Sequence, residues 1–154
     1  MRPQPLIRKV RFEIRPWDDG PDPARELLPY VDEVSLVELV SGYEHAAGHD
    51  VPGQYAGLVL DRFAFGDLTT YLSGRPDSAH RAGSGTIALL GCDCGEVGCW
   101  PLNAQVVAAD DVVTWRGFVQ PYRPGRDYAD FGPFVFRRDQ YERAVREAVT
   151  ASAR

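Results

Sequence analysis

Lysine, cysteine and long apolar runs are scarce in this chain. Lys9 is its only lysine, and it has three cysteines among 154 residues. No run of about twenty apolar residues is present, so we expect no membrane-spanning segment. The scarcity of cysteine leaves too few thiols for a disulfide framework, and the fold must be held by an ordinary apolar core.

The odd number of cysteines also bears on location, because secreted disulfide frameworks use cysteines in pairs. The basic N-terminus, residues 1–10, is followed by alternating polar residues rather than an apolar stretch, so we do not interpret it as an export signal. Thiols persist in reducing compartments. The expected location is therefore the cytoplasm.

Charge narrows the class of partner. The net charge is −5 at pH 7 and the basic residues are scattered, whereas sequence-independent nucleic-acid binding requires many phosphates to be neutralised together. We therefore expect no nucleic-acid partner. The length suits one domain, so we predict a single domain over residues 1–154 with a proline-rich connector at 16–29 inside it. The pattern leaves the oligomeric state open.

Several segments have the patterns of β-strands. Residues 6–15 alternate apolar and charged side chains, which is typical of an edge strand with one wet side. Residues 27–31 are expected to pair back on that strand. Segments 86–90, 100–108 and 112–119 are rich in strand-forming residues and predict a three-stranded antiparallel meander.

Helix signals lie between and after these strands. Ser35 and Glu38 form a capping box that predicts a short amphipathic helix, and Asp67 and Gly74 bound a second short helix. Asp139 is the expected N-cap of a terminal helix. The apolar face of that helix comprises Tyr141, Ala144, Val145, Ala148 and Val149. The predicted fold class is α+β, a mostly antiparallel β-sheet with a C-terminal helix and one or two short helices.

The three cysteines are clustered in Cys92-Asp-Cys94-Gly-Glu-Val-Gly-Cys99, at the first turn of the predicted meander. If the strand continues to this point, the first two sulfurs lie on one face. Gly95 and Gly98 allow the loop to fold back. The three thiols are then expected to converge, and they either hold a soft metal ion, form a reversible disulfide, or pack as small apolar groups.

A zinc site requires four tetrahedral ligands, so three sulfurs leave one position to fill. We take His49 as the candidate fourth metal ligand beside Cys92, Cys94 and Cys99. The other candidates for that position are His45, His80, Asp93, Glu96 and a water molecule. In the redox interpretation, Cys94 and Cys99 exchange a disulfide, although the acidic neighbours Asp93 and Glu96 oppose a reactive thiolate.

Two further groups of residues have a chemical interpretation. His45 and His49 share a face only if the helix that begins after Ser35 continues that far, and Gly48 lies between them. Solvated loop histidines are therefore favoured over a metal pair. Basic and aromatic side chains also interleave at Tyr122, Arg123, Arg126, Tyr128, Phe131, Arg137 and Arg138. We expect Asp127, Asp130 and Asp139 to pair with these arginines, and an anion or nucleotide on Arg123 and Arg126 is the weaker interpretation.

The C-terminal half carries a resemblance. The run Leu90–Leu102, the segments Val113–Trp115 and Gln120–Arg123, and the closing Phe134–Tyr141 are similar to a family of small bacterial proteins. That family shares a Cys-x-Cys-Gly-x-x-Gly-Cys loop, a downstream Val-x-Trp and an aromatic segment that leads into a Tyr-containing helix. The family is uncharacterised, so the resemblance implies a family and no activity.

The leading functional hypothesis is non-enzymatic. The cysteine loop is structural or binds zinc, and the protein acts through a partner protein, with Trp100 and Trp115 as candidate exposed aromatic residues. A thiol-dependent redox enzyme or sensor that uses Cys94 and Cys99 is the alternative. No acid pair, nucleophile elbow or phosphate loop identifies catalytic or cofactor-binding residues.

Overall fold

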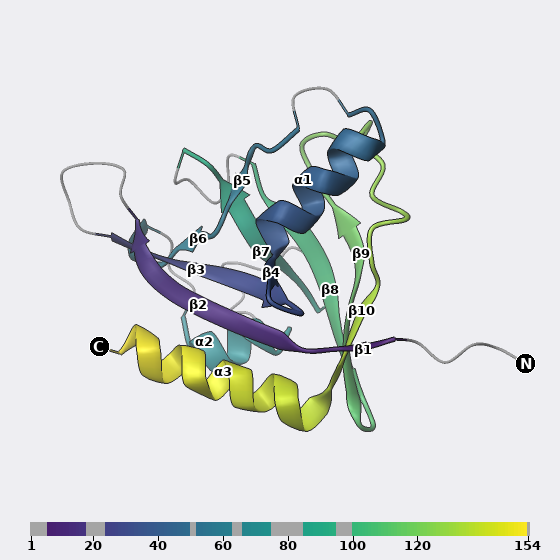
Figure 1. Ribbon diagram of the computed structural model, residues 1–154. Coiled ribbons are helices and arrows are strands. Elements are labelled where there is room, and N and C mark those ends of the chain that lie inside the picture. The colour runs from purple at the N-terminus through teal and green to yellow at the C-terminus, as the bar shows by residue number, and fades with distance from the viewer. Residues whose placement is uncertain are drawn as a thin grey trace, which may run out of the picture.

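The alternating N-terminal segment forms strand β2 (Val10–Trp17), which pairs antiparallel with β3 (Ala24–Val31) along its whole length (Figure 1). The structure is a computed structural model that describes residues 6–17, 24–49, 52–62, 66–74, 85–94 and 100–153. Strands β4 (Val34–Ser35) and β6 (Leu58–Val59) also pair with β3, so β2 lies at the edge of a four-stranded sheet. The edge strand predicted over residues 6–15 and its pairing with 27–31 are confirmed from Val10 onward, whereas Ile7 and Arg8 belong to the other sheet.

The bounds predicted for the proline-rich connector, residues 16–29, are wrong at both ends. Residues 16 and 17 remain in β2, and β3 already begins at Ala24, which leaves 18–23, outside the described residues, for the connection. Pro16 is tolerated because β2 is an edge strand. Pro16 lies six residues after Val10, so the backbone nitrogens of the two residues face the same side of the strand. The amide of Val10 points away from β3, toward the side chain of Gln140, so a missing amide at Pro16 removes no bond to β3.

The predicted meander is the centre of a second sheet of six strands in the order β1, β10, β9, β8, β7, β5. All neighbours in it are antiparallel except β1 and β10. The strands are β1 (Ile7–Arg8), β5 (Tyr55–Ala56), β7 (Thr86–Cys92), β8 (Leu102–Ala109), β9 (Val112–Val119) and β10 (Phe134–Arg137). The chain passes from one sheet to the other between β1 and β2, which couples the two sheets at their edges.

Two of the three helices begin directly after the capping residue that the sequence predicts. Helix α1 (Leu36–Ala46) begins where the hydroxyl of Ser35 accepts the Glu38 amide, and α2 (Leu68–Leu72) begins after the cap Asp67. A short 3₁₀ turn, η1 (Leu60–Arg62), follows β6. The terminal helix α3 (Arg138–Ser152) starts two residues earlier than predicted, because β10 leads directly into it and Arg137 takes the cap position without a side-chain bond. Asp139 instead accepts the Gln140 amide inside the first turn.

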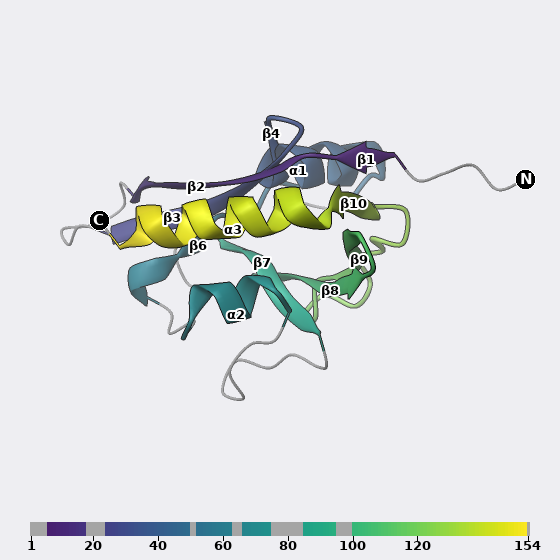
Figure 2. The same ribbon diagram turned by 90° about the horizontal axis from the view of Figure 1, so that it is seen from below.

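The core lies between the two sheets and α3. Figures 1 and 2 show α3 running alongside β2, with α2 on its other flank. Trp115 is fully buried, packs edge-on against Phe136, and donates its indole N–H to the hydroxyl of Tyr141. The terminal helix buries four of its five predicted apolar residues there. The molecule is a single α+β domain, and none of its described helices is long and apolar enough to cross a membrane.

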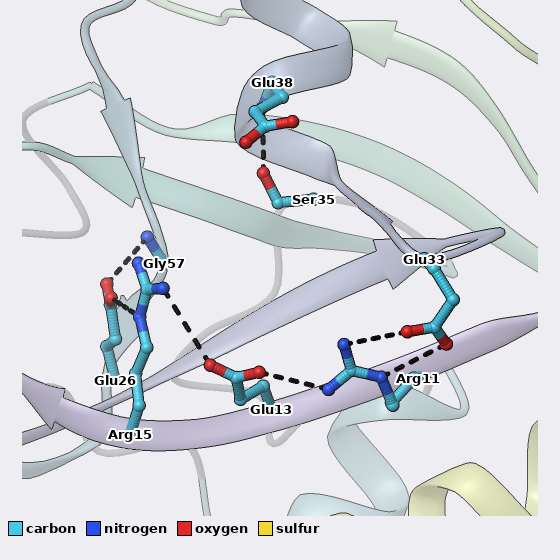
Figure 3. Close-up of polar contacts among 8 residues, drawn as sticks. All are labelled: Arg11, Glu13, Arg15, Glu26, Glu33, Ser35, Glu38 and Gly57. Atoms are coloured by element: carbon cyan, nitrogen blue, oxygen red, sulfur yellow. Dashed lines mark hydrogen bonds and ion pairs between the residues drawn. The ribbon is translucent and has the colours of Figure 1, made fainter.

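Charged side chains form a ladder on the other face of β2, which Figure 3 shows. The ladder runs through Glu33, Arg11, Glu13, Arg15 and Glu26. Glu26 is buried, and its second carboxylate oxygen accepts the Gly57 amide at 3.1 Å. A Cβ atom at position 57 would lie 2.7 Å from the Leu27 carbonyl, so only glycine fits this close approach. The ladder fastens β6 to the first sheet.

Candidate functional site

A buried carboxylate, Glu44, lies in the last turn of α1 and is fully inaccessible to solvent. One of its oxygens accepts the hydroxyl of Tyr128 at 2.6 Å and the guanidinium of Arg126 at 2.5 Å. The other oxygen accepts the Gly53 amide at 3.1 Å. Burying a carboxylate is costly unless it is paired and hydrogen-bonded, and all of these conditions are met here.

Tyr55 extends this network toward the cysteines. Its hydroxyl lies 2.8 Å from that of Tyr128, whose own proton is directed at Glu44, so Tyr55 is the donor. Burial raises the pKa of Tyr128 to about 12, and burial also raises the pKa of Tyr55 well above its usual range. Both phenols are therefore neutral at physiological pH. Tyr55 belongs to β5 and pairs through its backbone with Cys92 on β7.

The cysteine loop starts at the end of β7. Cys92 is buried, and its sulfur accepts the amide of Cys94 at 3.4 Å and lies 3.6 Å from a carboxylate oxygen of Asp93. Cys94 is exposed. The strand ends at Cys92, so the condition for the first two sulfurs to lie on one face of it is not met. Cys99 lies outside the described residues, and the convergence of three sulfurs stays a prediction.

Trp100 follows the loop and is half-buried. Its ring packs against that of Tyr55, with 6.3 Å between centroids, and two guanidinium groups lie over it. Those groups belong to Arg123, at 4.6 Å from the ring centre, and Arg126, at 5.1 Å. Arg126 therefore links Trp100 to Glu44. Both ends of the cysteine loop are thus attached to the same buried polar cluster, which we call the Glu44 network: Glu44, Tyr55, Arg126 and Tyr128.

The two described histidines have different environments. Helix α1 ends at Ala46, so His45 and His49 do not share a helical face. His45 is exposed, as predicted for a solvated residue. His49 is not a solvated loop residue: its ring lies edge-on to that of Tyr128 at 5.5 Å, and its Nδ1 is buried with no hydrogen-bond partner in the described part of the chain. His80 lies outside the described residues.

No three His, Cys, Asp or Glu side chains gather into a potential metal site within the described ranges. These ranges include His49, Cys92 and Cys94 but omit Cys99 and Glu96, so the predicted zinc site itself remains a prediction.

Two other expectations about this region are wrong. Arg126 pairs with Glu44 rather than with Asp127 or Asp130, because the chain after β9 folds back over the end of α1. Of the three aspartates expected to pair with arginines, Asp139 does so, at 3.9 Å from Arg137. Trp115 is fully buried and belongs to no surface. Trp100, with the exposed Arg123 over it, remains accessible, and Val119 and Tyr122 of the same segment as Arg123 are exposed; we call these four residues the loop-side surface. Tyr122 is 59% exposed and Val119 is 41% exposed.

The sequence interpretation missed Glu44, although a signal was present. Leu36, Val40 and Glu44 recur every fourth residue, which places a carboxylate on the apolar face of α1. A carboxylate in that position requires a buried partner. The partners Arg126 and Tyr128 come from a loop more than eighty residues later, which no local pattern reveals.

The arrangement of the Glu44 network suits a structural role. Glu44 accepts hydrogen bonds from Gly53, Arg126 and Tyr128, its side chain has no access to solvent, and the tyrosines that surround it stay protonated. A catalytic acid or base must reach the proton it transfers, which a fully enclosed carboxylate does not. No protein-family model, curated protein or solved structure matches this chain. Its function is therefore inferred from the geometry of the site.

Proposed function

We propose that this protein is a non-enzymatic cytoplasmic binding domain whose cysteine loop is a structural element, held by zinc, that presents the loop-side surface to a partner protein. The observation that carries the proposal is the attachment of both ends of the loop to the Glu44 network. Cys92 is joined to it through backbone pairing with Tyr55, and Trp100 through ring contacts with Tyr55 and Arg126. Membership of the bacterial family that shares this loop is part of the proposal.

Two local contacts support the metal. The Cys94 amide is directed at the sulfur of Cys92, which is the kind of outer contact that orients a thiolate ligand of zinc. His49 has a buried ring nitrogen without a partner, and it packs against Tyr128 in the same network. In this proposal Cys92, Cys94, Cys99 and His49 are the four ligands. Zinc then replaces the apolar core that a short glycine-rich loop lacks.

The loop-side surface supports the partner. Aromatic residues and arginine dominate the energetics of protein interfaces, and Trp100 with Arg123 stacked over it is such a pair. Arg123 has no carboxylate within ion-pair distance in the described part of the chain. An acidic partner surface would supply that carboxylate.

Zinc binding is tested on the full chain, purified without a tag and in the absence of oxygen. Native and denatured masses are compared, and reactive thiols are counted before and after addition of a chelator. We expect a mass difference that matches one zinc and three thiols that react only after chelation. Three thiols that react freely in the absence of metal would overturn the zinc proposal.

A matched pair of variants tests the fourth ligand. His49→Ala is expected to weaken zinc retention, whereas His45→Ala, an exposed histidine four residues away, is expected to leave it unchanged. Equal retention in both variants would exclude His49 as a ligand. Cys92→Ser should abolish retention if the sulfur that receives the Cys94 amide is a ligand.

Binding of a partner protein to the loop-side surface is tested separately. A protein captured by the wild-type chain is expected to be lost with Arg123→Glu and retained with Arg137→Glu, an exposed arginine at the start of α3. Retention of the same protein by Arg123→Glu would remove the loop-side surface from the proposal while leaving the zinc result intact.

A redox function is the second candidate, because Cys94 is exposed next to a buried Cys92. An accessible thiol is the one that attacks or is attacked in disulfide exchange. In this alternative, Cys94 and Cys99 are missing from the thiol count until a reductant is added. The mass then falls by two hydrogens on oxidation and shows no zinc. This outcome would replace the zinc proposal.

A further inference from the structure

A groove lies on the part of the molecule where α2, α3 and β8 meet, and none of the Glu44 network or loop-side residues lines it. Its volume is about 740 Å³, within the range of small-molecule sites. Figure 2 shows the two helices side by side. One end is closed where α2 reaches Gly74, whose absent Cβ would lie 2.9 Å from the Cβ of Val106.

The interior of the groove is apolar. Val106, Val113 and Val145 are buried side chains that line it, and Tyr141 contributes its ring. The polar atom of Tyr141 is already engaged, since its hydroxyl donates to the Leu72 carbonyl and accepts the Trp115 indole N–H. A ligand therefore meets hydrocarbon rather than an unsatisfied donor in the interior.

The rim of the groove is basic. Three exposed charged residues of α3 line it: Arg138, Glu142 and Arg146. Arg138 and Glu142 neutralise one another through an ion pair at 3.0 Å. Arg146 has no carboxylate within ion-pair distance among the residues that the structure describes. The rim thus has one surplus positive charge, carried by a planar group that binds carboxylates through two parallel hydrogen bonds.

We propose that this groove binds a small amphipathic carboxylate, with its apolar body against Val106, Val113, Val145 and Tyr141 and its carboxylate on Arg146. The two halves of the argument come from independent observations: the apolar side chains that line the groove, and an arginine at its rim with no ion-pair partner among the described residues. The site is separate from the cysteine loop, and its occupancy does not depend on zinc.

The proposal is tested by titrating decanoate into the full chain and measuring heat, with decanol as the neutral analogue of equal chain length. Arg146→Gln removes the charge at the rim, and Ala108→Phe fills the groove from an exposed position on β8, so buried side chains need not move. Arg143→Gln is the matched control, because Arg143 is an arginine of the same helix that does not line the groove.

We expect saturable one-site binding of decanoate and weaker binding of decanol. Arg146→Gln should weaken decanoate binding by about tenfold or more, as loss of a charge-assisted hydrogen bond does. Ala108→Phe should abolish it, and Arg143→Gln should leave it within about twofold of wild type. Absence of saturable binding by the wild type, equal binding of decanol, or binding that survives Ala108→Phe would overturn the proposal.

Discussion

Two glutamates, Glu44 and Glu26, are buried although they carry carboxyl groups. Each accepts a backbone amide from a neighbouring segment and pairs with an arginine. The attraction within such a pair roughly offsets the cost of removing the two charges from water, so the pair adds little when intact. Removing the arginine, however, leaves a buried carboxylate without its opposite charge. The glutamates therefore act mainly by specifying which segments meet.

Glu44→Ala is expected to destabilise the protein by about 3–5 kcal/mol, because it removes the buried carboxylate that accepts the Gly53 amide, the Arg126 guanidinium and the Tyr128 hydroxyl. Urea unfolding measures the loss. Glu38→Ala, in the exposed first turn of the same helix, should cost less than about 1 kcal/mol and is the control. Similar losses in the two variants would contradict the assignment of Glu44 as a buried anchor.

Gly57→Ala is expected to destabilise the protein by about 1–3 kcal/mol, because the added methyl group would lie 2.7 Å from the Leu27 carbonyl and 2.8 Å from a Glu26 oxygen. Gly42→Ala in α1 is the matched comparison. Nothing lies within 4 Å of its added methyl group, and alanine in a helix interior is favoured over glycine by about 0.5–1 kcal/mol. Thermal unfolding of both variants should give shifts of opposite sign; shifts of the same sign would refute the steric argument.

At the scale of elements, the free edge of β2 is closed by α3. The side-chain amide of Gln140 accepts the Val10 amide at 3.0 Å and donates to the Val10 carbonyl at 2.7 Å. It therefore occupies the position that another strand would take. This contact lies where the chain leaves the second sheet at β1 and enters the first at β2. One side chain thus holds the helix, the sheet edge and the crossing point together.

Gln140→Ala is expected to cost about 1–2 kcal/mol, because it removes both hydrogen bonds to Val10. The more specific readout is hydrogen exchange of the Val10 amide, which should become faster than in the wild type. Glu147→Ala, on the exposed face of α3, is the control and should leave that amide protected. Unchanged exchange at Val10 in the Gln140 variant would show that this edge is protected by other contacts.

At the scale of the whole molecule, four tyrosines are buried in the core or in the Glu44 network: Tyr55, Tyr71, Tyr128 and Tyr141. Burial is the largest cause of a raised pKa in each of them. The pKa of Tyr128 rises to about 12 from an ordinary value of 10. The folded protein therefore retains phenolic protons at alkaline pH that the unfolded chain has already lost.

The sign of the pH dependence follows directly. Below pH 10 these phenols are protonated in both the folded and the unfolded state, so stability does not depend on their titration. Between pH 10 and 12 only the unfolded chain releases the Tyr128 proton, so the free energy of unfolding falls as the pH rises. Each such tyrosine contributes a slope of up to about 1.4 kcal/mol per pH unit. Urea unfolding at a series of alkaline pH values, followed by tyrosinate absorbance, measures this.

Tyr128→Phe provides the control for the alkaline effect. It lowers stability at every pH by removing the bond to Glu44, but it should also make the decline above pH 10 less steep, because one titrating group is absent. A stability that stays constant well above pH 10 in the wild type would contradict the burial of these phenols.

Much of the fold follows from local pattern. The alternation in residues 6–15, the capping box at Ser35 and the periodic apolar face of the terminal helix predict β2, α1 and α3 because these signals arise from backbone geometry and neighbouring side chains. The meander of β7, β8 and β9 was predictable for the same reason. The two-residue strands β1, β4, β5 and β6 were not, because each exists only through its partner in space.

The sequence alone determined the α+β class, the main elements and the clustering of the thiols, since all three are properties of neighbours along the chain. Only the tertiary structure decided which segments surround the cysteine loop. Burial of Trp115, the pairing of Glu44 with Arg126 and the charge balance of the groove depend on contacts between distant segments. Such contacts form when apolar faces pack and each buried charge must find a partner, and neither requirement is visible in local pattern.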